Sequence, residues 1–241
     1  MTAISAWNRL QYRDQPKAPT ALHCLSMSLS ESFFGDFFEA DRGRLRKPEA
    51  LDGIVARTAE LDFGMASEPR TGVLLQMLAA TKPGGRFLEL GTGTGLATAW
   101  LLSGMDAAST LTSVDTNEEV QGVASELLGG DPRLKLLTLD GAAFLWRQPK
   151  KCYDLVFADA IPGKYEALDE ALAVVKVGGY YVIDDMLPQP NWPEGHGEKA
   201  VALLVQLSTD PRFFMLPLPW STGIAVLVRK PRQGASLESC G

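Results

Sequence analysis

Short apolar runs alternate with helix-like patterns over most of the chain. Residues 96–102, 118–128, 142–147 and 165–175 have helical periodicity, and in the last stretch Leu168, Leu172 and Val175 are spaced i, i+4, i+7. A strand followed by a helix, repeated along the chain, predicts βαβ units and a parallel sheet with helices on both faces. The runs that read as strands are RFLEL (86–90), TLTSV (110–114), LKLLTL (134–139), YDLVFA (153–158) and YYVI (180–183).

The C-terminal part breaks this alternation. After a helical stretch at 198–207 come RFFMLPL (212–218) and GIAVLVRK (223–230), separated only by PWST. Parallel strands need a crossover of about a dozen residues or more, so these two strands are expected to be antiparallel. The predicted fold class is α/β, a Rossmann-like, doubly wound and mostly parallel seven-stranded sheet that ends in an antiparallel hairpin.

The N-terminal region shows no strand pattern. SLSESFFGDFFEA (28–40) and PEALDGIVARTAEL (48–61) read as helices, with Ser and Pro near their starts. We expect an N-terminal helical cap over 1–63, the main domain over 64–230 and a disordered tail over 231–241. The cap could simply cover the sheet or could form a lid or dimerisation arm over a site.

Composition narrows the possible partners. The 241 residues carry a formal net charge of −6, and hydrophobic residues make up 46%. An acidic chain lacks the cationic surplus that would displace counterions from a nucleic acid or an anionic membrane, so neither is an expected partner. Three widely spaced cysteines, Cys24, Cys152 and Cys240, indicate a reducing compartment, and no apolar leader or membrane span is visible. We expect a cytoplasmic protein.

The strongest local motif is FLELGTGTGLATAWLL (87–102), in which a strand enters a glycine-rich loop and a helix follows at once. Gly91, Gly93 and Gly95 allow a ligand to approach the main chain at the carboxyl end of the first strand. A nicotinamide dinucleotide site would have its third glycine at position 96, which is Leu96 here. The loop could also be a plain tight turn.

Carboxylates lie in or directly after four successive predicted strands. They are Glu89, Asp115, Asp140 (followed by Gly141 and Ala142) and Asp159. The carboxyl ends of parallel strands meet at the edge where open α/β sheets bind ligands, so these side chains are expected to gather there. Each aspartate singly could instead cap a helix.

These features together resemble the class I S-adenosylmethionine-dependent methyltransferases over about residues 64–230. The segments ASEPRTGVLLQMLAA and FADAIPGKYEALDEAL look like the catechol and caffeoyl-CoA type of O-methyltransferase. The resemblance implies a pocket for S-adenosylmethionine in which Glu89 and the loop of Gly91, Thr92, Gly93 and Gly95 hold the methionine end. It further implies that Asp115 binds the ribose, that Asp140, Gly141 and Ala142 line the adenine, and that a homodimer forms.

The same resemblance implies a divalent cation, such as Mg²⁺, held by Asp159, Asp184 and Asp185, with Asp185 standing where the family has Asn. Oxygen ligands of this kind suit Mg²⁺. Without a metal, Asp159 would instead contact the amino group of the donor. The family's catalytic lysine falls at Pro162, and Lys164 lies two residues later. The expected catalytic residues are therefore Lys164 and Asp159.

The sequence thus predicts a methyltransferase that acts on a small molecule, with a phenolic or other hydroxyl oxygen as the methyl acceptor. Trp192 and His196, in a loop rich in Pro and Gly after the last parallel strand, could contact the acceptor. Two alternatives stay open: a nucleotide- or S-adenosylmethionine-binding regulatory module without catalysis, and a nicotinamide-dependent oxidoreductase.

Overall fold

The computed structural model describes residues 47–231, which form one α/β unit. Its strands follow the chain as β1 Arg86–Leu90, β2 Thr110–Asp115, β3 Leu134–Thr138, β4 Tyr153–Ala158, β5 Val175–Ile183, β6 Phe213–Leu218 and β7 Ile224–Arg229. The helices are α3 Leu51–Glu60, α4 Pro69–Ala80, α5 Leu96–Gly104, α6 Glu118–Leu128, α7 Gly141–Leu145, α8 Ile161–Lys164, α9 Leu168–Val174 and α10 His196–Ser208.

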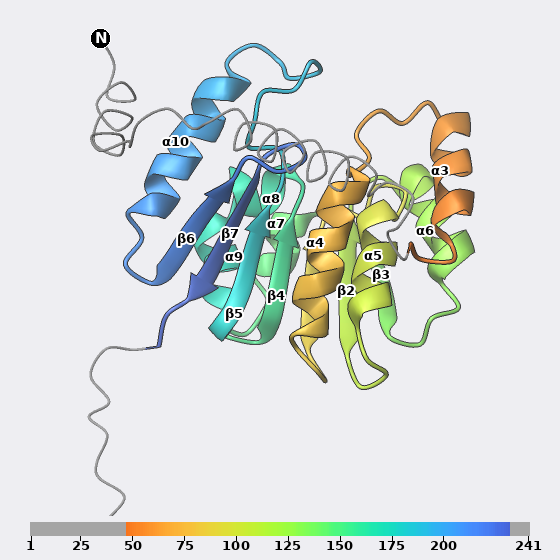
Figure 1. Cartoon of the computed structure of the whole chain (residues 1–241), viewed down its shortest axis with the longest axis horizontal. Coiled ribbons are helices and arrows are strands. Elements are labelled where there is room, and N and C mark those ends of the chain that lie inside the picture. The colour runs from red at the N-terminus through yellow and green to blue at the C-terminus, as the bar shows by residue number, and fades with distance from the viewer. Residues whose placement is uncertain (1–46, 232–241) are drawn as a thin grey trace, which may run out of the picture. The chain divides into compact units, whose positions relative to one another are not determined.

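The predicted fold class is confirmed. The seven strands form one sheet in the order β3-β2-β1-β4-β5-β7-β6, parallel except where β7 pairs with β5 and with β6. One apolar cluster lies between the sheet and α7, α9 and α10, and a second lies under α3, α4, α5 and α6. Figure 1 shows α4 and α5 in front of the sheet. Helices on both faces explain the nearly continuous apolar strands.

The register of the parallel strands brings their carboxyl ends to one edge. Leu90 pairs with Val114 on one side and with Ala158 on the other, and Ala158 pairs with Ile183. The residues that follow these positions in the chain, Gly91, Asp115, Asp159 and Asp184, therefore lie side by side. The edge predicted from the sequence to bind a ligand exists as expected.

The predicted starts of two elements after β4 are wrong. The helix expected from Tyr165 begins only at Leu168, and the strand expected at 180–183 extends back to Val175. Pro162 and Gly163 have non-helical backbone angles, and Ala167 lies in the left-handed region with φ 50°. The preceding segment is therefore folded as an irregular turn, which delays the helix by one turn.

The expected cap falls largely outside the described residues, as do the helix at 28–40 and residues 232–241 of the tail. From the expected cap, α3 is present as a helix and packs on α5 and α6. The domain boundaries themselves stay a prediction. Within residues 47–231, no helix has the length and apolar character needed to cross a membrane.

Candidate active site

The loop between β1 and α5 lies directly against the end of β4. Gly91 has φ 99°, and a Cβ there would lie 2.5 Å from the carbonyl oxygen of Asp159. Gly95 has φ 95°, and a Cβ there would lie 2.8 Å from Cβ of Ala124 in α6. Glycine is required at both positions, because each combines a left-handed backbone with a close approach to a neighbouring element.

Asp115 fixes this loop to the end of β2. Its Oδ2 accepts a hydrogen bond from the Gly93 amide at 2.8 Å, and its Oδ1 accepts one from the Asn117 amide at 2.9 Å. Each carboxylate oxygen has a second lone pair free for a further donor. The carboxylate therefore remains able to accept hydrogen bonds from a ligand.

A cavity of about 330 Å³ opens above the loop. It is lined by Phe63, Gly91, Thr92, Gly93, Asp115 and Asp159, among others. Of the residues expected to bind the cofactor, the structure thus brings the loop and two of the carboxylates to one cavity. Gly95 does not line it, because it is turned toward α6.

Glu89 lies beneath the loop rather than in the cavity. Its side chain is fully buried, and Oε2 accepts hydrogen bonds from the hydroxyls of Thr98 and Ser113, whereas Oε1 has no hydrogen-bond partner. Burial raises the pKa of Glu89 to about 8, despite these hydroxyls, which lower it. The Ser113 hydroxyl also bonds that of Thr92 at 2.6 Å, so Glu89 connects to the cavity wall through Ser113 and Thr92.

Asp140 has a local structural role. Its Oδ1 accepts a hydrogen bond from the Ala143 amide at 2.7 Å and caps α7. Asp140, Gly141 and Ala142 line neither this cavity nor the one described next. Their contact with an adenine ring stays a prediction.

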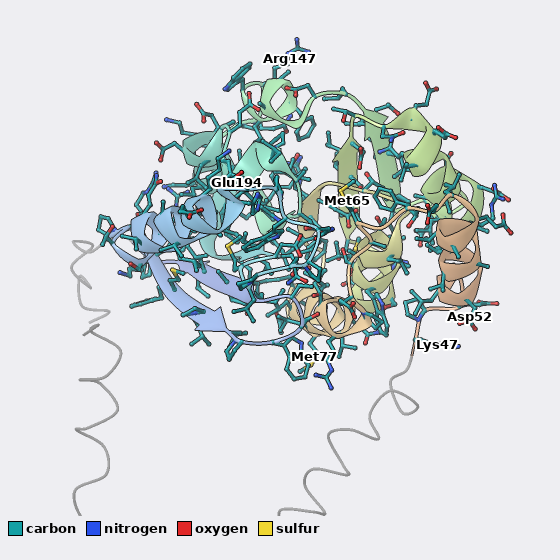
Figure 2. All side chains as sticks on the ribbon, turned by 90° about the horizontal axis from the view of Figure 1, so that it is seen from above. Lys47, Asp52, Met65, Met77, Arg147 and Glu194 are labelled. Carbon is teal, nitrogen blue, oxygen red and sulfur yellow. The ribbon has the colours of Figure 1, made fainter. Side chains whose placement is uncertain are left out.

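A second cavity of about 520 Å³ adjoins the first. Met65, Ala66, Ser67, Asp159 and Ala160 line both, so the two spaces share one wall. Figure 2 labels Met65, which is 71% exposed and belongs to the segment that joins α3 to α4. A molecule in one cavity would therefore meet a molecule in the other beside Asp159.

Lys164 projects into the second cavity although its side chain is only 6% exposed. Its Nζ lies 3.1 Å from Oδ1 of Asp159 and 3.8 Å from Oδ2 of Asp185. Burial alone would lower the pKa of Lys164, but the charges of Asp159, Asp185 and Asp184 raise it above its ordinary value. The side chain is therefore an ammonium, not a free base, in this arrangement.

Asp184 and Asp185 follow β5 at the same edge. Asp184 is buried, and its Oδ1 accepts hydrogen bonds from the Thr222 hydroxyl and from the Asp185 amide. Burial and the charges of Asp159 and Asp185 raise the pKa of Asp184 to about 7. Asp185 has φ 59°, is 39% exposed in the cavity wall, and has a pKa raised by burial and by the charge of Asp159.

The three aspartates expected to hold a divalent cation thus lie together, but they do not fit that ion as they stand. The Lys164 ammonium already bonds Asp159 and pairs with Asp185. Within the described part of the chain, no group of three or more His, Cys, Asp or Glu side chains is arranged to hold a metal ion. The metal stays an untested prediction, and no catalytic step is derived from it.

Three aromatic side chains line the second cavity. The Tyr165 hydroxyl lies 3.3 Å from Nε2 of His196, and the His196 ring lies 4.6 Å from that of Trp192, centroid to centroid. Burial and the charges of Lys164 and Lys199 lower the pKa of His196, so the ring is neutral near pH 7. Trp192 and His196 thus line the second cavity, and their contact with an acceptor stays a prediction.

Sequence reasoning missed two residues of this site. Ser67 donates to Oδ2 of Asp159 at 2.9 Å, and Thr222 donates to Asp184. Thr222 belongs to the short connection before β7, and the pairing of β7 with β5 brings that connection to Asp184. An expected antiparallel hairpin beside β5 could have indicated Thr222, whereas nothing in the sequence pattern indicated Ser67.

Comparisons with known proteins identify relatives of this chain. A family model described as a methyltransferase domain matches residues 88–186. A protein of Mycolicibacterium smegmatis named "Putative O-methyltransferase" is 36% identical over 191 residues, which are 74% of this chain and 91% of that protein. A relative of the same name from Mycobacterium ulcerans is 35% identical over 134 residues, 53% of this chain and 60% of the relative.

Solved structures share the fold. The O-methyltransferase TomG from Streptomyces achromogenes, solved with S-adenosylmethionine, has a TM-score of 0.66 at 21% identity, covering 78% of this chain and 92% of its own. An O-methyltransferase from Bacillus cereus, solved with S-adenosylhomocysteine, has a TM-score of 0.65 at 19% identity. The match covers 77% of this chain and 93% of that one. The chain belongs to the methyltransferase family, among relatives named as O-methyltransferases.

Proposed function

We propose that this enzyme transfers the methyl group of S-adenosylmethionine to a hydroxyl oxygen of a small molecule. The observation that carries this proposal is the pair of cavities that share Asp159, one above the glycine loop and one beside Lys164 and Asp185. A methyl transferase needs two such adjoining spaces, because the donor and the acceptor must meet in line for displacement.

The first cavity suits the donor. Its wall carries Asp115 and Asp159, and S-adenosylmethionine is a cation at both its sulfonium and its amino group. Asp115 is positioned to accept hydrogen bonds from ribose hydroxyls, as it ends the second strand. The TomG structure was solved with S-adenosylmethionine and the Bacillus cereus structure with S-adenosylhomocysteine, which supports the same donor here.

The second cavity suits an acceptor with a hydroxyl group. The acceptor oxygen forms a bond to the methyl carbon while the carbon–sulfur bond breaks, and S-adenosylhomocysteine leaves. The hydroxyl proton passes to the carboxylate of Asp185, the most exposed of the three carboxylates in the wall. Lys164, held by Asp159, donates a hydrogen bond to the acceptor oxygen and stabilises its developing negative charge.

The aromatic wall favours a planar acceptor. Tyr165, Trp192 and His196 present rings to the same cavity, and stacked or edge-on ring contacts add about 0.5–1.5 kcal/mol beyond burial of area. A phenol is therefore the favoured acceptor class. The comparisons give no support to a non-catalytic module or to a nicotinamide-dependent oxidoreductase.

The predicted cytoplasmic location and homodimer belong to the same proposal. The buried free thiol of Cys152 is consistent with a reducing compartment. Phe214 and Leu216 are exposed on β6, the edge strand of the sheet, and offer apolar surface for a second copy. Light scattering coupled to size-exclusion chromatography of the full-length chain distinguishes a dimer from a monomer.

Transfer of a labelled methyl group tests the activity. We expect radioactive methyl from S-adenosylmethionine to appear on a phenolic probe such as a catechol with the wild-type chain, and not with Asp115→Ala. Absence of transfer to any of a panel of phenols, in a protein that binds S-adenosylhomocysteine, would contradict the phenolic acceptor while leaving the donor assigned.

A further inference from the structure

The carboxylates of Asp159, Asp184 and Asp185 surround a charged group that the chain itself supplies. The ammonium of Lys164 lies 3.1 Å from Asp159 Oδ1 and 3.8 Å from Asp185 Oδ2, and Lys164 and Asp184 are buried. Buried carboxylates need a compensating cation or a proton, because isolated charge is strongly unfavourable away from water. Here one buried lysine supplies a positive charge to the cluster.

We propose that Lys164 is the resident cation of this cluster, and that its ammonium excludes a divalent ion from the place between the three carboxylates. The exclusion of a divalent ion does not depend on the activity proposed above. It has one catalytic consequence, which rests on that proposed function: an ammonium rather than a metal faces the acceptor oxygen.

The hydrogen-bond geometry argues against both cations at once. A divalent ion bound to Asp159 Oδ1 would lie about 2–2.5 Å from the oxygen that accepts the Lys164 bond. Unit charges about 4 Å apart already change an equilibrium by a factor of hundreds at an effective dielectric of about 20. Asp184 is a poor replacement ligand, because its Oδ1 already accepts bonds from Thr222 and from the Asp185 amide.

The turn that carries Lys164 is tightly packed. The Gly163 carbonyl accepts a hydrogen bond from the buried Tyr181 hydroxyl, and the Gly163 amide donates to the Glu166 carbonyl at 2.7 Å. Gly163 has φ 90°, and a Cβ there would lie 2.7 Å from Leu90 Cδ1, so the turn is packed tightly against β1. The turn therefore fixes the backbone from which the Lys164 side chain reaches Asp159.

Metal binding measured directly, without turnover, tests the proposal. Mn²⁺ is titrated into the full-length wild type, Lys164→Met and the control Lys176→Met, with binding read by electron paramagnetic resonance of the free ion. Lys176 also pairs with an aspartate, at 2.7 Å from Asp154 Oδ2, but that pair adjoins the start of β4, at the opposite end of the strand from Asp159. S-adenosylhomocysteine binding by calorimetry is recorded for each protein as a separate test of the donor pocket.

We expect no saturable Mn²⁺ binding to the wild type or to Lys176→Met up to millimolar metal. Lys164→Met should bind Mn²⁺ saturably at a concentration at least tenfold lower. Wild-type binding at micromolar metal, or no gain in Lys164→Met, would overturn the proposal. If Lys164→Met does not fold, Lys164→Gln, which keeps an amide donor for Asp159, takes its place with the same two outcomes. Failure to bind S-adenosylhomocysteine would count against the proposed function and not against Lys164.

Discussion

The hydroxyl of Ser67 donates a hydrogen bond to Oδ2 of Asp159 across 2.9 Å. This contact ties the segment between α3 and α4 to the end of β4, at the wall common to both cavities. Asp159 thus accepts a hydrogen bond from Ser67 on one oxygen and from Lys164 on the other. A single carboxylate therefore positions residues on both the donor side and the acceptor side of the site.

The first prediction concerns that contact. Ser67→Ala leaves Asp159 with one donor fewer, and a hydrogen bond to a charged group is worth about 1.5–3 kcal/mol. We expect S-adenosylhomocysteine to bind about tenfold or more weakly by calorimetry, because the segment over the cavity loses its anchor. Ser103→Ala, which removes a serine hydroxyl bonded to the Trp100 carbonyl instead, should bind normally. Equal affinities in the two variants would show that the anchor is irrelevant.

The second prediction separates backbone strain from a steric clash. Gly91→Ala places a Cβ 2.5 Å from the Asp159 carbonyl oxygen, whereas Gly84→Ala, also at positive φ, meets nothing within 4 Å. Both variants bear left-handed strain of about 1–2 kcal/mol, but only Gly91→Ala should displace Asp159. We expect Gly91→Ala alone to abolish measurable S-adenosylhomocysteine binding. Retained binding in Gly91→Ala would refute the close packing of loop and strand.

The third prediction follows from the raised pKa of Glu89. The folded value of about 8 exceeds the ordinary 4.5, so between these pH values the unfolded chain has lost a proton that the folded chain keeps. Stability contributed by this group is present at low pH and falls as pH rises toward 8, by about 1.4 kcal/mol per pH unit.

Glu89→Gln removes this titration, so its free energy of unfolding should decline less between pH 5 and about 8. Denaturant melts at several pH values measure the difference from wild type. The exposed Glu60→Gln is the control, since it leaves the buried network of Thr98 and Ser113 intact. Parallel stability profiles for Glu89→Gln and wild type would mean that Glu89 is ionised in the folded protein.

The fourth prediction assigns the aromatic wall to the acceptor. Trp192→Ala should raise KM for a phenolic acceptor about tenfold, with little change in S-adenosylhomocysteine affinity, since Trp192 lines only the second of the two cavities. Trp146→Ala, which removes an exposed tryptophan after α7, should change neither value. A loss of S-adenosylhomocysteine affinity in Trp192→Ala would contradict this assignment and would place Trp192 in the donor cavity.

The sequence pattern was sufficient for the sheet and for the positions of Asp115, Asp159 and Asp184. Apolar runs of strand length fix which residues end each strand, and parallel register then brings those ends to one edge. The same logic could not tell which aspartate faces a cavity. Asp140 follows a strand like the others, yet its carboxylate bonds its own helix.

Details of the acceptor side depended on tertiary contacts that no periodicity reports. The irregular turn at Pro162 and Gly163 aims Lys164 at Asp159, and it displaced the predicted start of α9 to Leu168. Ser67 reaches Asp159 from 92 positions away in the chain. Glu89 lies beneath the loop, because alternation along β1 turns it toward Thr98, and its expected place at the methionine end of the donor stays a prediction.

Calorimetric titration of the wild-type chain with S-adenosylhomocysteine, and separately with NAD, tests the central assignment most directly. We expect saturable binding of S-adenosylhomocysteine at one site per chain, lost in Asp115→Ala, and no binding of NAD. Binding of NAD without binding of S-adenosylhomocysteine would contradict this assignment.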